Sequence, residues 1–182
     1  MSNNLMAELL LPDIKNTPEY YENLYPARNL PEGARVTRVA PSPTGYLHLG
    51  VLFAALVNRI TATSTNGIFF TRIEDTDKKR EVKGGIEDII GGLGRFGITI
   101  DEGFVSGENQ VGIYGPYQQS QREEIYKTYV KELIKQGLAY PCFALLKSLQ
   151  VLEKFKKHKR FVPVITANGL NIVTFLTKKP RL

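Results

Sequence analysis

The sequence predicts an α/β protein with an open parallel sheet, and three segments carry that prediction. Residues 35–40 alternate like a half-buried strand, and residues 68–73 read as a second strand. Between them, residues 52–60 repeat apolar side chains at helical spacing. A helical connection between two strands of one sheet allows the strands to run parallel.

The first 33 residues read as an N-terminal helical extension. Thr17 and Pro18 predict the start of a short helix, because threonine caps helix N-termini and proline suits the first turn. Residues 25–26 and 30–33 contain the proline and glycine that close this segment before the first strand.

The loop after the first strand is the most informative stretch. Pro41 and Pro43 lack amide donors and restrict the residues before them, and Gly45 permits a turn closed to other residues. His48 and Gly50 therefore lie where a strand has ended and a helix begins. Free amides and the helix dipole favour phosphate there, and a histidine can donate to a phosphate oxygen.

Residues 92–97 match the pattern G-x-G-x-x-G, but their surroundings argue against a dinucleotide site. That fingerprint follows a strand and opens a helix. Here residues 86–90 read as helix and residues 98–100 read as strand, which is the reverse order. The glycines are expected to weaken a helix end.

The last predicted helix begins near residue 120. Residues 120–123 read as a capping box, and an apolar stripe follows over residues 126–134. Gly137 is expected to end this helix.

The net charge of +6 is unevenly distributed. Residues 144–182 hold nine Lys or Arg and one acid, which is +8, so residues 1–143 carry −2. The basic character therefore gives no reason to expect nucleic-acid binding by the first 143 residues.

Composition excludes several protein classes. No apolar run is long enough to span a membrane, the N-terminus lacks a signal-peptide pattern, and one cysteine excludes an internal disulfide framework. We expect a cytoplasmic protein.

Four ordered blocks resemble the bacterial-type glutamyl-tRNA synthetases, which are class I aminoacyl-tRNA synthetases. The blocks are residues 37–50, 70–77, 115–122 and 138–143, and the likeness runs from about Leu10 to Phe143. The resemblance implies part of a Rossmann-like doubly wound parallel sheet. It also implies activation of L-glutamate by ATP with Mg²⁺, giving glutamyl-adenylate, and transfer to tRNA(Glu) by a monomer without a resident metal.

The resemblance also implies roles for single residues. His48 would stabilise charge on the α-phosphate of ATP as the catalytic residue. The nucleotide-binding residues would be Pro43, Thr44, Gly45, His48 and Gly50. Arg38, Ser42 and Glu74 would hold glutamate: Arg38 its side-chain carboxylate and Glu74 its α-ammonium group. Asp77 would lie near the tRNA acceptor end, with a surface role as the equal alternative. Val51 departs from the small residue usual in the family and is expected to crowd the nucleotide.

The resemblance divides the chain into an extension (1–33), half of a catalytic domain (34–143) and a basic tail (144–182). Read one base out of frame, the tail permits family-like residues, which predicts a frameshift after Phe143 and a poorly ordered tail. The alternative is a genuine tail whose basic run, residues 154–160, binds phosphates or anionic lipid.

Three functions stay open at this point. The first is the N-terminal part of a glutamate–tRNA ligase. The second is a truncated, non-catalytic product with at most weak ATP or glutamate binding. The third is the shorter paralogue that glutamylates queuosine on tRNA.

Overall fold

The computed structural model describes residues 2–106, 109–142, 161–167 and 170–175. These residues form two units by their packing, one of residues 22–124 and one of residues 1–21 with 125–182. The predicted division at residues 33 and 143 concerns family domains and stays a prediction.

The unit of residues 22–124 contains the parallel strands that the sequence predicts. Its strands are β1 (Val36–Val39), β2 (Ile68–Thr71), β3 (Gly103–Ser106) and β4 (Asn109–Val111), and its helices are α3 (Leu49–Ser64), α4 (Gly85–Arg95) and η1 (Gln119–Arg122). β1 pairs with β2 in parallel, with Val36 opposite Ile68 and Val39 opposite Thr71. The α/β class and the parallel pairing are therefore confirmed.

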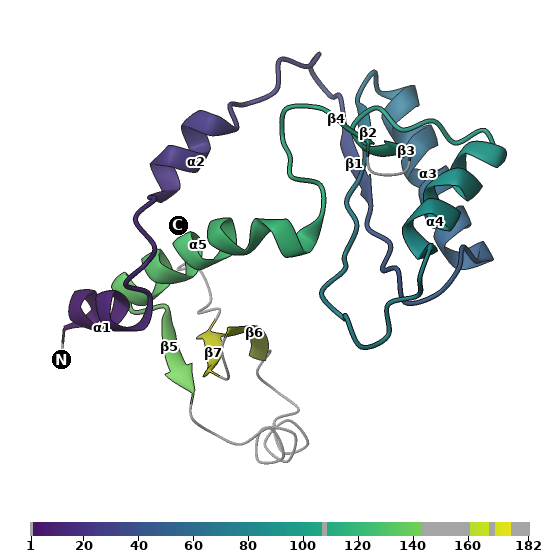
Figure 1. Ribbon diagram of the computed structural model, residues 1–182. Coiled ribbons are helices and arrows are strands. Elements are labelled where there is room, and N and C mark those ends of the chain that lie inside the picture. Colours follow the sequence, from purple (N-terminus) through teal and green to yellow (C-terminus); the bar gives the residue numbers. More distant parts are fainter. Residues whose placement is uncertain (1, 107–108, 143–160, 168–169, 176–182) are drawn as a thin grey trace. The chain divides into compact units, whose positions relative to one another are not determined.

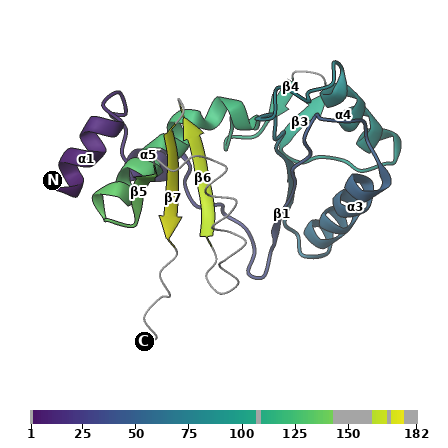
Figure 2. The same cartoon turned by 90° about the horizontal axis from the view of Figure 1, so that it is seen from below.

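Helices α3 and α4 pack into one core with these strands. The buried residues of this core are Val39, Ala55, Ala62, Phe69, Leu93 and Ile98. Both views of the ribbon place α3 and α4 on the same side of β1 (Figures 1 and 2). The fully buried residues of α3 are the alanines Ala55 and Ala62, and several of its larger apolar residues lie outside the core. Phe53 and Ile60, for example, are 66% and 57% exposed.

Two predicted elements of this unit differ in the structure. Residues 98–100 form no strand; β3 begins later, at Gly103. α4 also continues through Gly91, Gly92 and Gly94 to Arg95, so these glycines are helical. Residues 92–95 of the G-x-G-x-x-G pattern lie at the end of α4 and not at its start, so the pattern does not open a helix as the fingerprint requires.

The predicted capping box at residues 120–123 is wrong. Residues 119–122 form the 3₁₀ helix η1, and α5 (Glu123–Lys135) follows it. The Ser120 hydroxyl donates to Asp75 at 2.7 Å, so it is engaged in a long-range contact instead of a local cap. The apolar stripe of residues 126–134 is nevertheless helical, as predicted.

The unit of residues 1–21 and 125–182 contains α1 (Asn3–Leu10), most of α5, and the strands β5 (Ala139–Cys142), β6 (Phe161–Ala167) and β7 (Leu170–Phe175). Its core joins Ala7 of α1 to Val130 and Ile134 of α5. α2 (Pro18–Leu24) begins at Pro18, as predicted, with the Thr17 hydroxyl accepting from the Tyr20 amide.

The strands β5, β7 and β6 form an antiparallel sheet in that order (Figure 2). The last two strands lie in the tail for which the sequence predicts poor order, and they are rich in β-branched residues, which favour strands. The remaining tail residues, 144–160, 168–169 and 176–182, lie outside the described part, as does Phe143.

Candidate functional site

The candidate site lies at the edge of the sheet where β1 and β2 end. Beyond the strands, the Arg72 amide donates to the Val39 carbonyl at 3.1 Å and the Glu74 amide donates to the Pro41 carbonyl at 2.9 Å. These two bonds extend the parallel pairing past the last strand residues. The loop after β1 and the segment after β2 are therefore held side by side, at the edge where open α/β sheets bind ligands.

A small cluster of opposite charges forms at this edge. Arg38 Nη1 lies 3.4 Å from Glu74 Oε1, and Arg72 Nη2 lies 3.2 Å from the same oxygen. The Arg38 and Glu74 side chains are 38% and 34% exposed, so solvent reaches both. Among the described residues, Arg72 Nε is buried without a hydrogen-bond partner. The cluster thus offers a guanidinium and a carboxylate together, which suits a ligand that carries both charges.

The pairing of Arg38 with Glu74 is weak enough to open for a ligand. It is one long contact between half-exposed groups, and such surface ion pairs contribute about 0–1 kcal/mol. A zwitterionic ligand could replace it by pairing its carboxylate with Arg38 and its ammonium with Glu74. Arg72 would keep a second contact on the Glu74 carboxylate.

His48 caps α3. Its Nδ1 accepts a hydrogen bond from the Gly50 amide at 3.2 Å, and its carbonyl accepts from the Leu52 amide. Because Nδ1 is the acceptor, the proton of the neutral ring lies on Nε2. The exposed imidazole therefore has one N–H available for an oxygen ligand near the start of α3, whose first turn has free amides.

The loop between β1 and α3 is fixed through its prolines. Pro41 and Pro43 are buried, and the Pro43 carbonyl accepts from the Val82 amide at 2.8 Å. Ser42 is exposed between them, and Thr44 and Gly45 are half-buried.

Val51 packs against the core of Val39 and Ala55, where it is half-buried. The side chain therefore has an apolar contact of its own, whereas the crowding of a nucleotide by Val51 stays a prediction.

Asp75 is the residue that sequence reasoning missed. Its side chain is fully buried and accepts four hydrogen bonds: from Lys78 Nζ, Gln118 Nε2 and the Ser120 hydroxyl at 2.7 Å, and from the Ser120 amide at 2.9 Å. Burial raises the pKa of this carboxyl, but the donors lower it more, so its pKa lies well below the usual range. The sequence showed Asp75 only as one acid among several.

Asp77 lies two residues away in a different environment. It pairs with Arg80, whose Nε and Nη2 lie 2.7 and 2.6 Å from Asp77 Oδ2. The hydrogen bond from Arg80 lowers the pKa of Asp77. The structure joins Asp77 to a local surface ion pair, and its predicted contact with tRNA stays a prediction.

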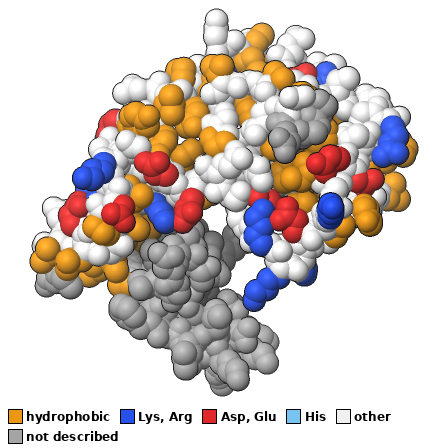
Figure 3. Space-filling model, viewed as in Figure 1, with side chains coloured by type: hydrophobic (Ala, Val, Ile, Leu, Met, Phe, Trp, Pro, Cys, Tyr) orange, Lys and Arg blue, Asp and Glu red, His pale blue; other side chains and the backbone are white. Residues whose placement is uncertain are grey.

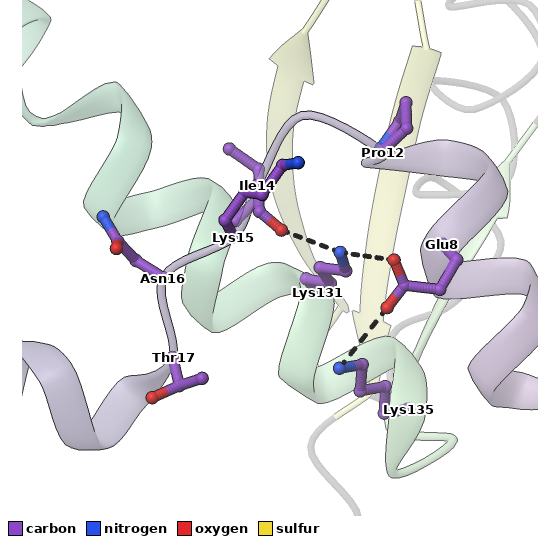
Figure 4. Close-up of a pocket in the computed structure, with 8 residues that line it drawn as sticks. All are labelled: Glu8, Pro12, Ile14, Lys15, Asn16, Thr17, Lys131 and Lys135. Atoms are coloured by element: carbon purple, nitrogen blue, oxygen red, sulfur yellow. Dashed lines mark hydrogen bonds and ion pairs between the residues drawn. The ribbon is translucent and has the colours of Figure 1, made fainter.

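A pocket in the other unit contains none of the predicted site residues (Figure 4). It has a volume of about 320 Å³ and is lined by Glu8, Pro12, Ile14, Lys15, Asn16, Thr17, Lys131 and Lys135. The buried ammonium of Lys131 donates to Glu8 Oε2 and to the Ile14 carbonyl, both at 2.8 Å. These contacts tie α1 and the following loop to α5, which is a structural role.

The charge distribution supports no single-sign binding surface on the face shown in Figure 3. Lys and Arg side chains alternate there with Asp and Glu side chains. Across the residues that the structure describes, no three His, Cys, Asp or Glu side chains gather as metal ligands do. No helix in the same residues is long and apolar enough to cross a membrane.

Comparison with known proteins places these observations in a family. Residues 35–166 match the model of the class I tRNA synthetases (E and Q), catalytic domain. The match continues past Phe143, where the motif resemblance was expected to end, and the origin of residues 144–182 stays a prediction.

Curated relatives and solved structures agree with the family match. The chain is 48% identical over 163 residues to the glutamate–tRNA ligase of Clostridium perfringens strain 13, covering 90% of this chain and 30% of the relative. It is 50% identical over 151 residues to that of Acetivibrio thermocellus, covering 82% and 27%. The crystal structure of a glutamate tRNA ligase from Elizabethkingia meningosepticum in complex with its amino acid superimposes with a TM-score of 0.57 and 40% identity, covering 68% of this chain and 24% of that one.

The chain thus spans about 30% of the length of these curated relatives. The matched region contains the paired parallel strands, the Arg38–Glu74 cluster and the His48 cap. The chain belongs to the class I tRNA synthetases of the glutamate and glutamine group, and it corresponds to part of their catalytic domain.

Proposed function

We propose that this chain carries the glutamate- and ATP-binding part of a glutamate–tRNA ligase. The observation that supports this most is the Arg38–Glu74 pair at the edge of the parallel strands. Free glutamate presents a side-chain carboxylate and an α-ammonium group. Arg38 would bind the carboxylate through two parallel hydrogen bonds, and Glu74 would bind the ammonium, with Ser42 adding a hydroxyl contact.

In this proposal the α-carboxylate of glutamate attacks the α-phosphorus of ATP. A carboxylate–phosphate bond forms, the bond to the β-phosphate oxygen breaks, and pyrophosphate leaves with its electron pair. His48 would stabilise the charge that grows on the α-phosphate, through its Nε2 proton. Pro43, Thr44, Gly45 and Gly50 would line the nucleotide site, since they belong to the loop and helix start that adjoin His48.

Mg²⁺ belongs to this proposal as part of the substrate. ATP carries phosphate oxygens, which are the ligands that Mg²⁺ prefers, so the ion would arrive bound to the nucleotide. The second step would transfer glutamate to the terminal ribose of tRNA(Glu). We also propose that the protein acts in the cytoplasm and as a monomer.

Glutamate binding by the 182-residue chain tests the proposal. Calorimetry or NMR titration should detect glutamate binding and much weaker binding of glutamine, which lacks the side-chain charge. Arg38→Lys should weaken glutamate binding about tenfold, because an ammonium cannot reproduce the bidentate contact.

The matched control is Arg35→Lys, an exposed arginine one residue before β1. It should leave glutamate affinity unchanged. Equal affinities for glutamate and glutamine, or equal losses in the two arginine variants, would reject the assignment of Arg38.

A truncated, non-catalytic product is the second candidate that the sequence leaves open. A measurement of glutamyl-adenylate formation distinguishes this candidate from a catalytically competent part of a ligase. Pyrophosphate exchange that depends on both glutamate and ATP would exclude it, whereas ligand binding without exchange would support it.

A further inference from the structure

Asp75 joins two parts of the chain that lie far apart in sequence. Of its four donors, one is on Lys78 of the same loop, one is on Gln118 just before η1, and two are on Ser120 within η1. Main-chain bonds surround this contact. The Ile73 amide donates to the Tyr117 carbonyl at 2.9 Å, and the Gln119 amide donates to the Ile73 carbonyl at 2.8 Å.

The segment of residues 117–120, which bonds to Asp75 and Ile73, is held in place by further contacts. Arg122 Nη1 donates to the carbonyls of Tyr114 and Pro116, at 3.3 and 2.8 Å. Tyr117 is buried, and its amide donates to Gln110 Oε1 at 2.8 Å. Asp75 is therefore anchored to a segment with several further contacts of its own.

Glu74 depends on these contacts for its position. Its carboxylate is one-third exposed and is held by two arginines at 3.2 and 3.4 Å, which are long contacts for charged groups. Its own amide has one bond, to Pro41. The residues on either side, Ile73 and Asp75, are fully buried and bonded to residues 117–120.

We propose that Asp75 is a positioning residue for the substrate ammonium group, because it fixes the backbone on which Glu74 presents its carboxylate. The inference rests on the proposed function. Its physical basis is that a charge aimed at a ligand is useful only when its own position is restricted, so that binding need not first order it. Asp75 does not contact the substrate; it acts through Glu74.

The experiment compares two ligands on the full 182-residue chain. Glutamate carries the α-ammonium group, and glutarate has the same carbon chain without it. Asp75→Asn turns an acceptor into a group that also presents N–H toward the donors, so the loop should loosen. We expect glutamate affinity to fall about tenfold while glutarate affinity stays within twofold of wild type.

A double-mutant cycle with Glu74→Gln tests whether Asp75 acts through Glu74. Once Glu74 has lost its charge, Asp75→Asn should have no further effect on glutamate affinity. Equal losses for both ligands, or additive effects in the Glu74→Gln background, would show a merely structural role and overturn the proposal.

Two further variants test whether the effect is specific to the hydrogen bonds of Asp75. Ser120→Ala removes one donor and leaves the carboxylate, so it should give a smaller loss with the same preference for glutamate over glutarate. Asp101→Asn is the control. Like Asp75, Asp101 accepts a hydrogen bond from a backbone amide, that of Phe69 at 2.9 Å, but among the described residues it has no hydrogen bond to residues 73–78. It should leave both affinities unchanged.

Hydrogen exchange separates failure of this inference from failure of the proposed function. A wild-type chain that binds neither ligand would reject the proposed function and the substrate role of Asp75 together. Exchange at the Glu74 amide should still be at least tenfold faster in Asp75→Asn. Unchanged exchange there would show that Asp75 does not hold Glu74, whatever the ligand results.

Discussion

At the scale of single residues, His48 combines a structural and a chemical task. Its Nδ1 holds the first turn of α3, which leaves the Nε2 proton for a ligand. A change to alanine removes both functions at once. Asparagine is a good helix cap without an imidazole, so the two variants together can separate the tasks.

We expect His48→Ala, in a chain extended to the length of its relatives, to slow adenylate formation about 100-fold while weakening ATP binding much less. The reason is that charge grows on the α-phosphate only in the transition state. Pyrophosphate exchange and separate nucleotide-binding measurements would test this. His48→Asn should show the same rate loss with near-normal thermal stability; equal losses in rate and binding would instead indicate simple ground-state binding.

The buried charge of Asp75 predicts a pH dependence of stability. An aspartate in the unfolded chain titrates near pH 4. Because the folded pKa is depressed, the charge contributes stability above about pH 4 that is lost as the pH falls toward the folded pKa. Asp75→Asn should therefore be less stable than wild type by about 1–3 kcal/mol at pH 7.

Urea unfolding between pH 7 and pH 2 provides the measurement. The difference in unfolding free energy between wild type and Asp75→Asn should narrow as the solution is acidified below about pH 4. A difference that stays constant over this range would contradict the pKa assignment.

At the scale of elements, α4 shows how one helix can need a glycine at one position and not at the next. A Cβ on Gly92 would lie 2.3 Å from Leu47 Cδ2, so the loop before α3 approaches this helix closely. A Cβ on Gly91 would meet nothing within 4 Å. The two glycines have the same helical propensity, and only their packing differs.

This difference gives a matched pair of variants. Gly91→Ala should stabilise the chain by about 0.5–1 kcal/mol, through helix propensity. Gly92→Ala should be less stable than Gly91→Ala by about 1–3 kcal/mol, because Leu47 must move. Thermal or denaturant unfolding would measure both, and similar stabilities would mean that Leu47 moves aside at little cost.

At the scale of the whole molecule, the chain has exposed apolar surface that a stable monomer normally covers. The outer side of α3 presents five large apolar side chains that are 44–80% exposed: Leu49, Phe53, Leu56, Val57 and Ile60. β1 and β2 also form a sheet of only two strands among the described residues, with isolated bridges at Phe70 and Ile73. Both features favour association.

We expect the purified 182-residue chain to be poorly soluble and not to charge tRNA. The 182 residues cover 30% of a curated relative, and pyrophosphate release needs positive groups on the departing phosphates. Residues 1–143 also carry a net charge of −2, which is unfavourable for holding an anionic tRNA. Robust glutamylation of tRNA by this chain, free of host enzyme, would defeat the prediction.

The frameshift after Phe143 stays a prediction at this scale. Sequencing the gene across the codons of Phe143 and Ala144 would decide it. A one-base correction that opens a longer reading frame would support the frameshift, whereas a gene sequence that needs no correction would favour a genuine tail.

The sequence predicts a structural feature well when that feature depends on residues that are close together in the chain. The strands near residues 36–39 and 68–71, the helix start at Pro18 and the loop before α3 follow from neighbouring residues, because proline, glycine and apolar spacing act locally. Arg38 and Glu74 then meet at one edge because parallel strands share the end at which their loops emerge.

The tertiary structure alone decided which acid of residues 74–77 is buried. Asp75 and Asp77 look alike in sequence, yet Asp75 is enclosed by donors that include Gln118 and Ser120, 43 and 45 residues away, whereas Asp77 pairs with Arg80 at the surface. The predicted Ser120 cap was wrong for the same reason. Burial and long-range hydrogen bonds depend on which distant segment packs against a residue, and no local pattern contains that information.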